Sequence, residues 1–133
     1  MVTGEDPFAV VPLVPPTDAE RRVAAGAVLV DVRSAPRRAA DGAIPGAIIA
    51  DRTNLAEEFG LDSPDRHAPI TSHETPIVVV CGSVDGSRPV AEALIEQGFT
   101  DVVHVEGGFA AWAAAGLPVT PPTATPSISA PRA

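Results

Sequence analysis

Hydrophobic residues along the chain gather in short runs separated by segments of mixed polarity. Two of these runs, AVLVDV at 27–32 and PIVVV at 76–80, are almost uninterrupted. A continuous apolar run of this length indicates a strand buried on both faces, as in a parallel sheet covered by helices. Shorter runs of β-branched and small apolar residues predict further strands at 10–14, 47–50 and 102–105.

The segments between these strands have apolar residues at helical spacing. The first, 17–26, begins with Thr17 and Glu20 at capping-box spacing and ends at Gly26, a residue type that commonly follows a helix. Further helices are predicted at 37–40, 54–59, 87–97 and 109–114. Strands that alternate with helices predict an α/β fold with about five mainly parallel strands and helices on both faces. Ligands of such sheets bind at the carboxyl ends of the strands.

The only cysteine, Cys81, directly follows the buried strand at 76–80 and so stands at its carboxyl end. The next helix is predicted to begin at Ser87, which leaves a connecting loop that we expect to bind an anion. This loop consists of Gly82, Ser83, Val84, Asp85, Gly86 and Ser87. Its two glycines allow the backbone to turn and aim N–H groups inward, where they and the helix N-terminus would stabilise a thiolate. Free cysteines are also often simply buried, so position alone leaves both interpretations open.

Composition narrows the class of protein. A chain of 133 residues with 45% hydrophobic residues is expected to form one domain with its own core. The formal net charge is −8 and the basic residues are scattered arginines, which argues against a nucleic-acid partner. No apolar run approaches bilayer length, and the N-terminus lacks the basic start of a signal peptide, so we expect a cytoplasmic protein without a membrane partner.

The two ends of the chain differ from its middle. Residues 120–133 are rich in proline and hold little that could be buried, which predicts a disordered tail. Residues 1–9 are expected to be flexible for the same reason, so the domain is predicted to span 10–119. The oligomeric state does not follow from the sequence.

Several motifs together resemble a single-domain rhodanese over about residues 12–119. These motifs are VLVDVRS at 28–34, GAIPGA at 42–47, IVVVCGSVDGS at 77–87 and GFTDVVHVEGGFAAWAAAGLPV at 98–119. The resemblance implies a rhodanese-like three-layer sandwich with the sheet in the middle. It also implies sulfur transfer, in which Cys81 takes sulfane sulfur from a small anionic donor such as thiosulfate, holds it as a persulfide and passes it to a thiol or another nucleophilic acceptor. No metal or organic cofactor is implied.

The loop departs from the family pattern Cys-x-x-Gly-x-Arg, because Val84 stands at the glycine and Gly86 at the arginine. Losing the arginine removes a positive charge and a fork of hydrogen-bond donors from the site. Arg88 could reach back over the loop, although it could equally be a solvated helix residue. Alternatively, Arg33 and Arg52 could supply the charge from the ends of other strands.

Other polar residues are weaker candidates. Asp31 ends a buried strand and is expected to support the cysteine loop rather than to react. His104 alternates with valines in a strand, where packing is favoured over a role as a base, and Glu106 could line the pocket or simply be solvated. His67 and His73 lie in a polar stretch, too far apart in the sequence to suggest a metal site.

Three classes of function therefore remain open. The first is a sulfurtransferase or persulfide carrier. The second is a catalytically weak rhodanese-like binding or regulatory module. The third, which we expect least, is phosphatase-like, arsenate-reductase-like or redox-sensing use of Cys81; a sensor that needs a second cysteine in the same chain is disfavoured, because none is present.

Overall fold

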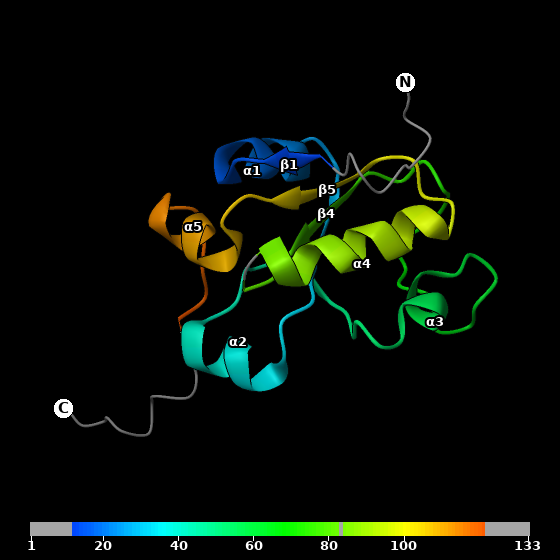
Figure 1. The fold of residues 1–133 in the computed structure, drawn as a ribbon, viewed down its shortest axis with the longest axis horizontal. Coiled ribbons are helices and arrows are strands. Elements are labelled where there is room, and N and C mark those ends of the chain that lie inside the picture. The colour runs from blue at the N-terminus through cyan, green and yellow to red at the C-terminus, as the bar shows by residue number, and fades with distance from the viewer. Residues whose placement is uncertain (1–11, 83, 122–133) are drawn as a thin grey trace.

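The structure, a computed structural model, describes residues 12–82 and 84–121 (Figure 1). Within these residues, five strands form one sheet in the order β1-β5-β4-β2-β3, and every neighbouring pair is parallel. The strands are β1 (Leu13–Val14), β2 (Val28–Asp31), β3 (Ile48–Ile49), β4 (Ile77–Val80) and β5 (Val102–Val105). The helices are α1 (Pro16–Ala24), α2 (Ala35–Asp41), α3 (Leu55–Phe59), α4 (Val84–Glu96) and α5 (Gly108–Ala114). The predicted α/β class with a parallel sheet is confirmed.

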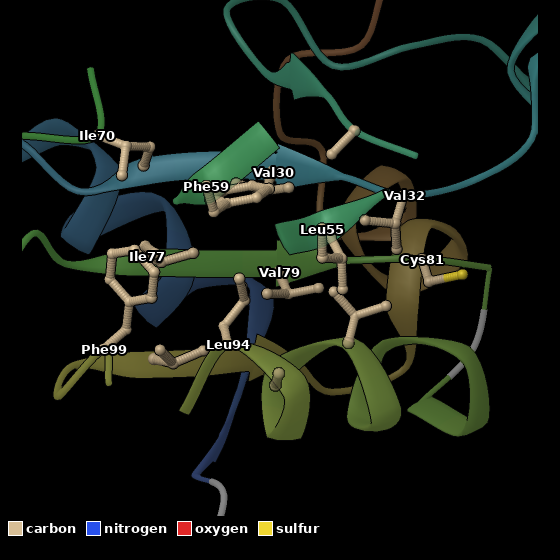
Figure 2. Close-up of a cluster of buried hydrophobic side chains, with 14 residues drawn as sticks. Val30, Val32, Leu55, Phe59, Ile70, Ile77, Val79, Cys81, Leu94 and Phe99 are labelled. Carbon is tan, nitrogen blue, oxygen red and sulfur yellow. The ribbon is translucent and has the colours of Figure 1, made fainter. Parts of the chain in front are cut away.

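The sheet is covered on both faces, so β4 at its centre is buried on either side. Ile77 and Val79 pack with side chains of α3 and α4 in one cluster (Figure 2). Val78 and Val80 face the opposite cluster, to which α1 and α5 contribute. This arrangement explains why β4 is an uninterrupted apolar run.

Side chains alternate along a strand, so residue 81 faces the same way as Ile77 and Val79. Cys81 accordingly belongs to the α3 and α4 cluster, and Figure 2 shows it at one end of that row. The sequence pattern thus determines not only that the thiol follows β4 but also which helix layer it faces.

Helix α4 begins at Val84, three residues earlier than the sequence predicts. Val84 to Ser87, expected in a loop, therefore form the first turn of this helix. Ser87 does not serve as the expected N-cap, because it is fully buried and its Oγ lies 2.8 Å from Nδ1 of His104. Pro89, expected in the first turn, lies inside the helix instead, where it gives up one intrahelical hydrogen bond.

The ends of the described region also differ in detail from expectation. Helix α1 begins at Pro16 with Pro15 as N-cap and no side-chain cap, so the predicted capping role of Thr17 is wrong. The isolated antiparallel bridge between Ala43 and Thr120 holds the chain beside the end of α2. The predicted flexible segment 1–9, the start of the predicted strand at 10–14 and residues 122–133 of the predicted tail lie outside the described residues. No helix in the described part is long and apolar enough to cross a membrane.

Candidate active site

Cys81 stands at the carboxyl end of β4 and is 7% exposed. Its backbone carbonyl accepts a hydrogen bond from the N–H of Phe109 at 2.8 Å, at the start of α5. Gly108 makes this close approach possible: its φ is +64°, and a Cβ there would lie 2.7 Å from the Cys81 carbonyl oxygen. The backbone at the thiol is therefore fixed by an element from the far end of the chain.

Arg52, in the segment that follows β3, donates a hydrogen bond to the thiol sulfur of Cys81. Arg52 Nη2 donates to Sγ at 2.9 Å and to the carbonyl of Val32 at 3.4 Å, and its Nη1 donates to the carbonyl of Gly86 at 3.3 Å. The guanidinium thus connects the ends of β2 and β4 with the first turn of α4. An arginine bonded to sulfur stabilises its anionic form through a charge-assisted hydrogen bond.

Gly86 lies against both the sulfur and the Arg52 guanidinium. A Cβ on this residue would come within 2.6 Å of Cys81 Sγ and 3.3 Å of Arg52 Nη2. A side chain at residue 86, where the family pattern has arginine, would therefore displace the sulfur or the Arg52 guanidinium. Since Gly86 is in the first turn of the 13-residue α4, the partial positive charge of this helix end lies beside the sulfur.

Asp31 and Arg33 form a buried ion pair at the end of β2, so Arg33 is not the available charge that the sequence suggested. The Arg33 Nη2 atom donates to Asp31 Oδ2 at 2.7 Å and to the carbonyl of Gly42 at 2.9 Å, and its Nε lies 3.1 Å from Asp31 Oδ1. Asp31 also accepts the backbone N–H of Arg33 at 3.0 Å. The guanidinium carbon lies 3.8 Å from the ring centre of Phe109. These contacts connect β2 to α2 and α5.

A pocket of about 810 Å³ opens beside the thiol. Its walls come from the turn after β2 together with α2, from the segment after β3, and from Cys81 and Gly82. Its polar lining comprises Arg33, Ser34, Arg37, Arg38, Asp51, Arg52, Glu58 and Cys81. A cavity of this size at the carboxyl edge of a parallel sheet is typical of a small-molecule site.

The sequence interpretation missed Arg37 and Arg38, which α2 brings to this pocket. Arg37 Nε donates to Asp41 Oδ2 at 3.2 Å, one turn along the helix, and its Nη2 lies 3.2 Å from the position that a Cβ on Gly82 would occupy. Arg38 Nη1 donates to the carbonyl of Arg33. The signal that could have found them is their position, since α2 follows a strand whose carboxyl end meets that of β4.

Two acidic residues also line the pocket. Hydrogen bonds from the hydroxyl and the backbone N–H of Thr53 hold the pKa of Asp51 below its usual range, so this carboxylate stays ionised. Glu58 lies 2.8 Å from Nε2 of His67 and accepts the backbone N–H of Asp51 at 3.2 Å. Both carboxylates are thus held by neighbours on their own side of the pocket.

The structure does not bring Arg88 to the pocket. Because α4 starts at Val84, Arg88 points outward, and its Nε donates to Glu92 Oε2 at 3.1 Å. His104 does not line the pocket either: it is buried and bonded to Ser87. Burial lowers the pKa of His104, the nearby Arg88 charge lowers it further, and Glu92 acts in the opposite direction.

The remaining candidates lie apart from the thiol. Glu106 is exposed and does not line the pocket, and the ring of His73 packs edge-on against Phe99. Among the described residues, no group of three or more His, Cys, Asp or Glu could hold a metal ion. Ser83 of the predicted loop lies outside the described residues.

The fold and this geometry define a class: single-sheet parallel α/β proteins that present a thiol beside a cation at the carboxyl end of the central strand. Residues 15–115 match the model of the rhodanese-like domain family. The chain therefore belongs to the rhodanese-like family, and the resemblance drawn from its sequence is confirmed.

Similar proteins agree with this assignment. A thiosulfate sulfurtransferase GlpE from Pseudomonas fluorescens is 36% identical over 99 residues, which cover 74% of this chain and 82% of the relative. A solved structure from Rhodopseudomonas palustris, described as a possible tyrosine phosphatase of unknown function, is 28% identical with a TM-score of 0.74 and covers 84% of this chain and 86% of its own. The rhodanese-like domain of an Anabaena protein shares the fold, with a TM-score of 0.70 at 21% identity over 92% of this chain and 86% of its own.

Proposed function

We propose that the protein is a sulfurtransferase that carries sulfane sulfur on Cys81. The observation that carries the proposal is the 2.9 Å hydrogen bond from Arg52 Nη2 to Cys81 Sγ, inside a pocket at the carboxyl end of β4. Relatives named thiosulfate sulfurtransferase support the reaction type. The partners are a small anionic sulfur donor and a thiol acceptor.

The chemistry needs an anionic sulfur at Cys81 in two states. With thiosulfate, the Cys81 thiolate attacks the outer sulfur; an Sγ–S bond forms, the S–S bond of the donor breaks, and its electron pair leaves with sulfite. The Cys81 persulfide keeps the negative charge, which Arg52 and the N-terminal end of α4 stabilise. An acceptor thiolate then attacks the outer sulfur of the persulfide and returns Cys81 to its thiolate.

Arg52 compensates for the arginine that the family pattern places at residue 86. Its guanidinium reaches the sulfur from the segment after β3, and the space it occupies is available because residue 86 is glycine. Glycine at residue 86 thus removes the loop arginine of the family and at the same time leaves room for the Arg52 guanidinium beside the sulfur. On this basis the altered loop is compatible with sulfur transfer.

The test is to incubate the purified protein with thiosulfate and to measure the mass of the intact chain. We expect the gain of one sulfur on the wild type, its removal by an added thiol, and no gain on Cys81→Ser with an unchanged circular dichroism spectrum. A wild-type thiol that stays unmodified with thiosulfate, 3-mercaptopyruvate and organic persulfides would contradict the proposal. The protein would then be a binding or regulatory module.

The phosphatase-like alternative has no comparable support. A phosphatase-like loop would need an arginine after Cys81 that reaches back to it, but Arg88, the arginine that follows Cys81 in the chain, pairs with Glu92 outside the pocket. The description of the Rhodopseudomonas relative as a possible tyrosine phosphatase applies to that protein. We therefore advance no second function.

A further inference from the structure

The pocket beside Cys81 is larger than a small inorganic anion requires. Its volume of about 810 Å³ lies in the range that accommodates organic ligands of drug size. The space extends from Cys81 and Arg52 towards α2, so a donor that filled it would reach the α2 wall with the end remote from its reactive sulfur. The residues on that wall therefore indicate what the remote end of the donor carries.

The arginines of the pocket differ in how far their hydrogen bonds are already used. Arg33 is paired with Asp31, and its remaining nitrogen, Nη1, is buried without a hydrogen-bond partner among the described residues. Arg38 donates through Nη1 to a backbone carbonyl, and Arg52 donates to Cys81, Val32 and Gly86. Arg37 uses its Nε on Asp41, whereas within 12–82 and 84–121 neither of its terminal nitrogens has a protein acceptor. Its side chain is 62% exposed and its Nη2 stands over Gly82, the residue after the thiol.

The lining of the pocket also includes an apolar surface. Ile49 of β3 lines the pocket and is 43% exposed, one of two large hydrophobic residues on the surface of the described region. Ala35 and Ala50 line the same cavity. A carbon frame lying over these side chains would remove apolar surface from water.

We propose that Arg37 forms a subsite for a carboxylate, and that the preferred donor is an organic persulfide whose carbon frame ends in that carboxylate. The inference rests on the proposed function and names its substrate class. The donor's outer sulfur lies at Cys81 and Arg52, its carbon frame at Ile49 and its carboxylate at Arg37. A guanidinium binds a carboxylate through paired N–H donors, and the two terminal nitrogens of Arg37 supply such a pair.

The transfer step balances without a further reactant. The Cys81 thiolate attacks the outer sulfur of the donor R–S–SH, the Sγ–S bond forms, and the donor's S–S bond breaks. Its electron pair leaves on the thiolate R–S⁻, while the proton stays on the transferred sulfur. Arg37 holds the carboxylate of R throughout, so it positions the donor and takes no part in the bond changes.

The test compares two donors that differ only in charge: the persulfides of 3-mercaptopropionate and of its neutral amide, 3-mercaptopropionamide. Sulfur loading of Cys81 is followed by intact mass, and kcat/KM is measured with a thiol acceptor. We expect the wild type to prefer the acid by about tenfold, as one charge-assisted interaction at an accessible site allows. Arg37→Ala should bring the ratio of the two donors close to one.

Arg88→Ala is the matched control. Like Arg37, Arg88 is an exposed helix arginine paired through Nε with an acid four residues on, but it lies outside the pocket. This variant should keep the wild-type preference. Equal use of both donors by the wild type, or a preference that survives Arg37→Ala, overturns the subsite while leaving sulfur transfer intact. Loading of Cys81 by thiosulfate but by neither persulfide overturns the subsite alone, whereas no loading by thiosulfate, 3-mercaptopyruvate or either persulfide overturns the proposed function and the subsite together.

Discussion

The neighbouring strands β2 and β4 both end at the same edge of the sheet, and each ends beside an arginine. At the end of β2, Asp31 and Arg33 are 0% and 3% exposed and form an ion pair within the core, which leaves Arg33 Nη1 buried without a hydrogen-bond partner among the described residues. At the end of β4, the sulfur of Cys81 accepts a hydrogen bond from Arg52, whose exposed side chain reaches it from the surface. An arginine thus has a buried carboxylate as its partner at the end of β2 and a thiol at the mouth of the pocket at the end of β4.

At this edge of the sheet the two arginines differ in burial rather than in residue type. A buried pair cannot exchange its partner, because either charge left alone would be costly. In the proposed function, Arg52 can exchange the sulfur for a substrate anion, because its side chain is exposed at the pocket. Substitutions at the two strand ends should therefore separate stability from activity.

Replacing Asp31 by Ala should lower the free energy of unfolding by about 3 to 5 kcal/mol, because Arg33 would keep a buried charge without its partner. Urea denaturation measures this effect. The control is Asp18→Ala, which removes an exposed helix pair with Arg21 and should cost less than about 1 kcal/mol. Similar losses of unfolding free energy in Asp31→Ala and Asp18→Ala would show that the buried Asp31–Arg33 pair does not stabilise the fold more than an exposed pair does.

Replacing Arg52 by Ala should affect the rate of sulfur loading and not the stability of the fold. We expect the unfolding free energy to change by less than about 1 kcal/mol, since this arginine is exposed. The rate of sulfur loading on Cys81 should fall by about 10-fold to 100-fold, because a donor that stabilises the anionic sulfur is lost. Stopped reactions analysed by intact mass give this rate, and wild-type loading by the variant would refute the role of Arg52.

Replacing Gly86 by Ala tests the close contact of residue 86 with the sulfur and Arg52. Alanine favours a helix by up to about 1 kcal/mol, yet its Cβ would lie 2.6 Å from Cys81 Sγ. The sulfur or Arg52 must move, so loading should slow by about tenfold with little change in stability. Because both substitutions disturb one contact, the double variant with Arg52→Ala should lose less than the product of the single losses. Fully multiplicative losses would mean that the two residues act independently.

The smallest expected effect concerns the pH dependence of stability. Burial lowers the pKa of His104, so below about pH 6.5 the unfolded chain binds a proton that the folded chain resists. Stability from this residue is therefore complete above that pH and decreases as the pH falls towards the folded-state value. His104→Gln can keep a bond to Ser87 and should show a shallower loss between about pH 7 and 5. Thermal melts measure this loss at each pH. If the melting temperature of the wild type and of His104→Gln fell equally between about pH 7 and 5, the account would be contradicted.

The sequence predicted the architecture well, because buried parallel strands leave an unmistakable pattern. The runs at 27–32 and 76–80 contain β2 and β4, and Cys81 follows from the second. Local signals failed where a distant contact decided the outcome. Ser87 has the residue type of an N-cap, but its hydroxyl contacts His104, 17 positions away, and the helix begins earlier.

The surroundings of the thiol were predictable only as a set of alternatives. The sequence offered three arginines as the source of positive charge near the thiol: Arg33, Arg52 and Arg88. It could not decide among them, because the contacts of each depend on a partner that only folding brings near. Arg33 meets Asp31, Arg88 meets Glu92, and Arg52 reaches the sulfur. Arg37 and Arg38 were missed because their helix was treated as a connection. Its place beside the pocket follows from the pairing of β2 with β4, which the sequence pattern does not specify.

The single cysteine at the end of β4 has a practical consequence for experiments on this protein. Any sulfhydryl reagent consumed by the folded chain reacts at the pocket itself, so its stoichiometry counts the molecules in a preparation whose Cys81 is reduced and accessible. Measured rates can then be normalised to these molecules rather than to total protein. A fluorophore coupled through that sulfur would likewise label one defined position without first engineering a cysteine.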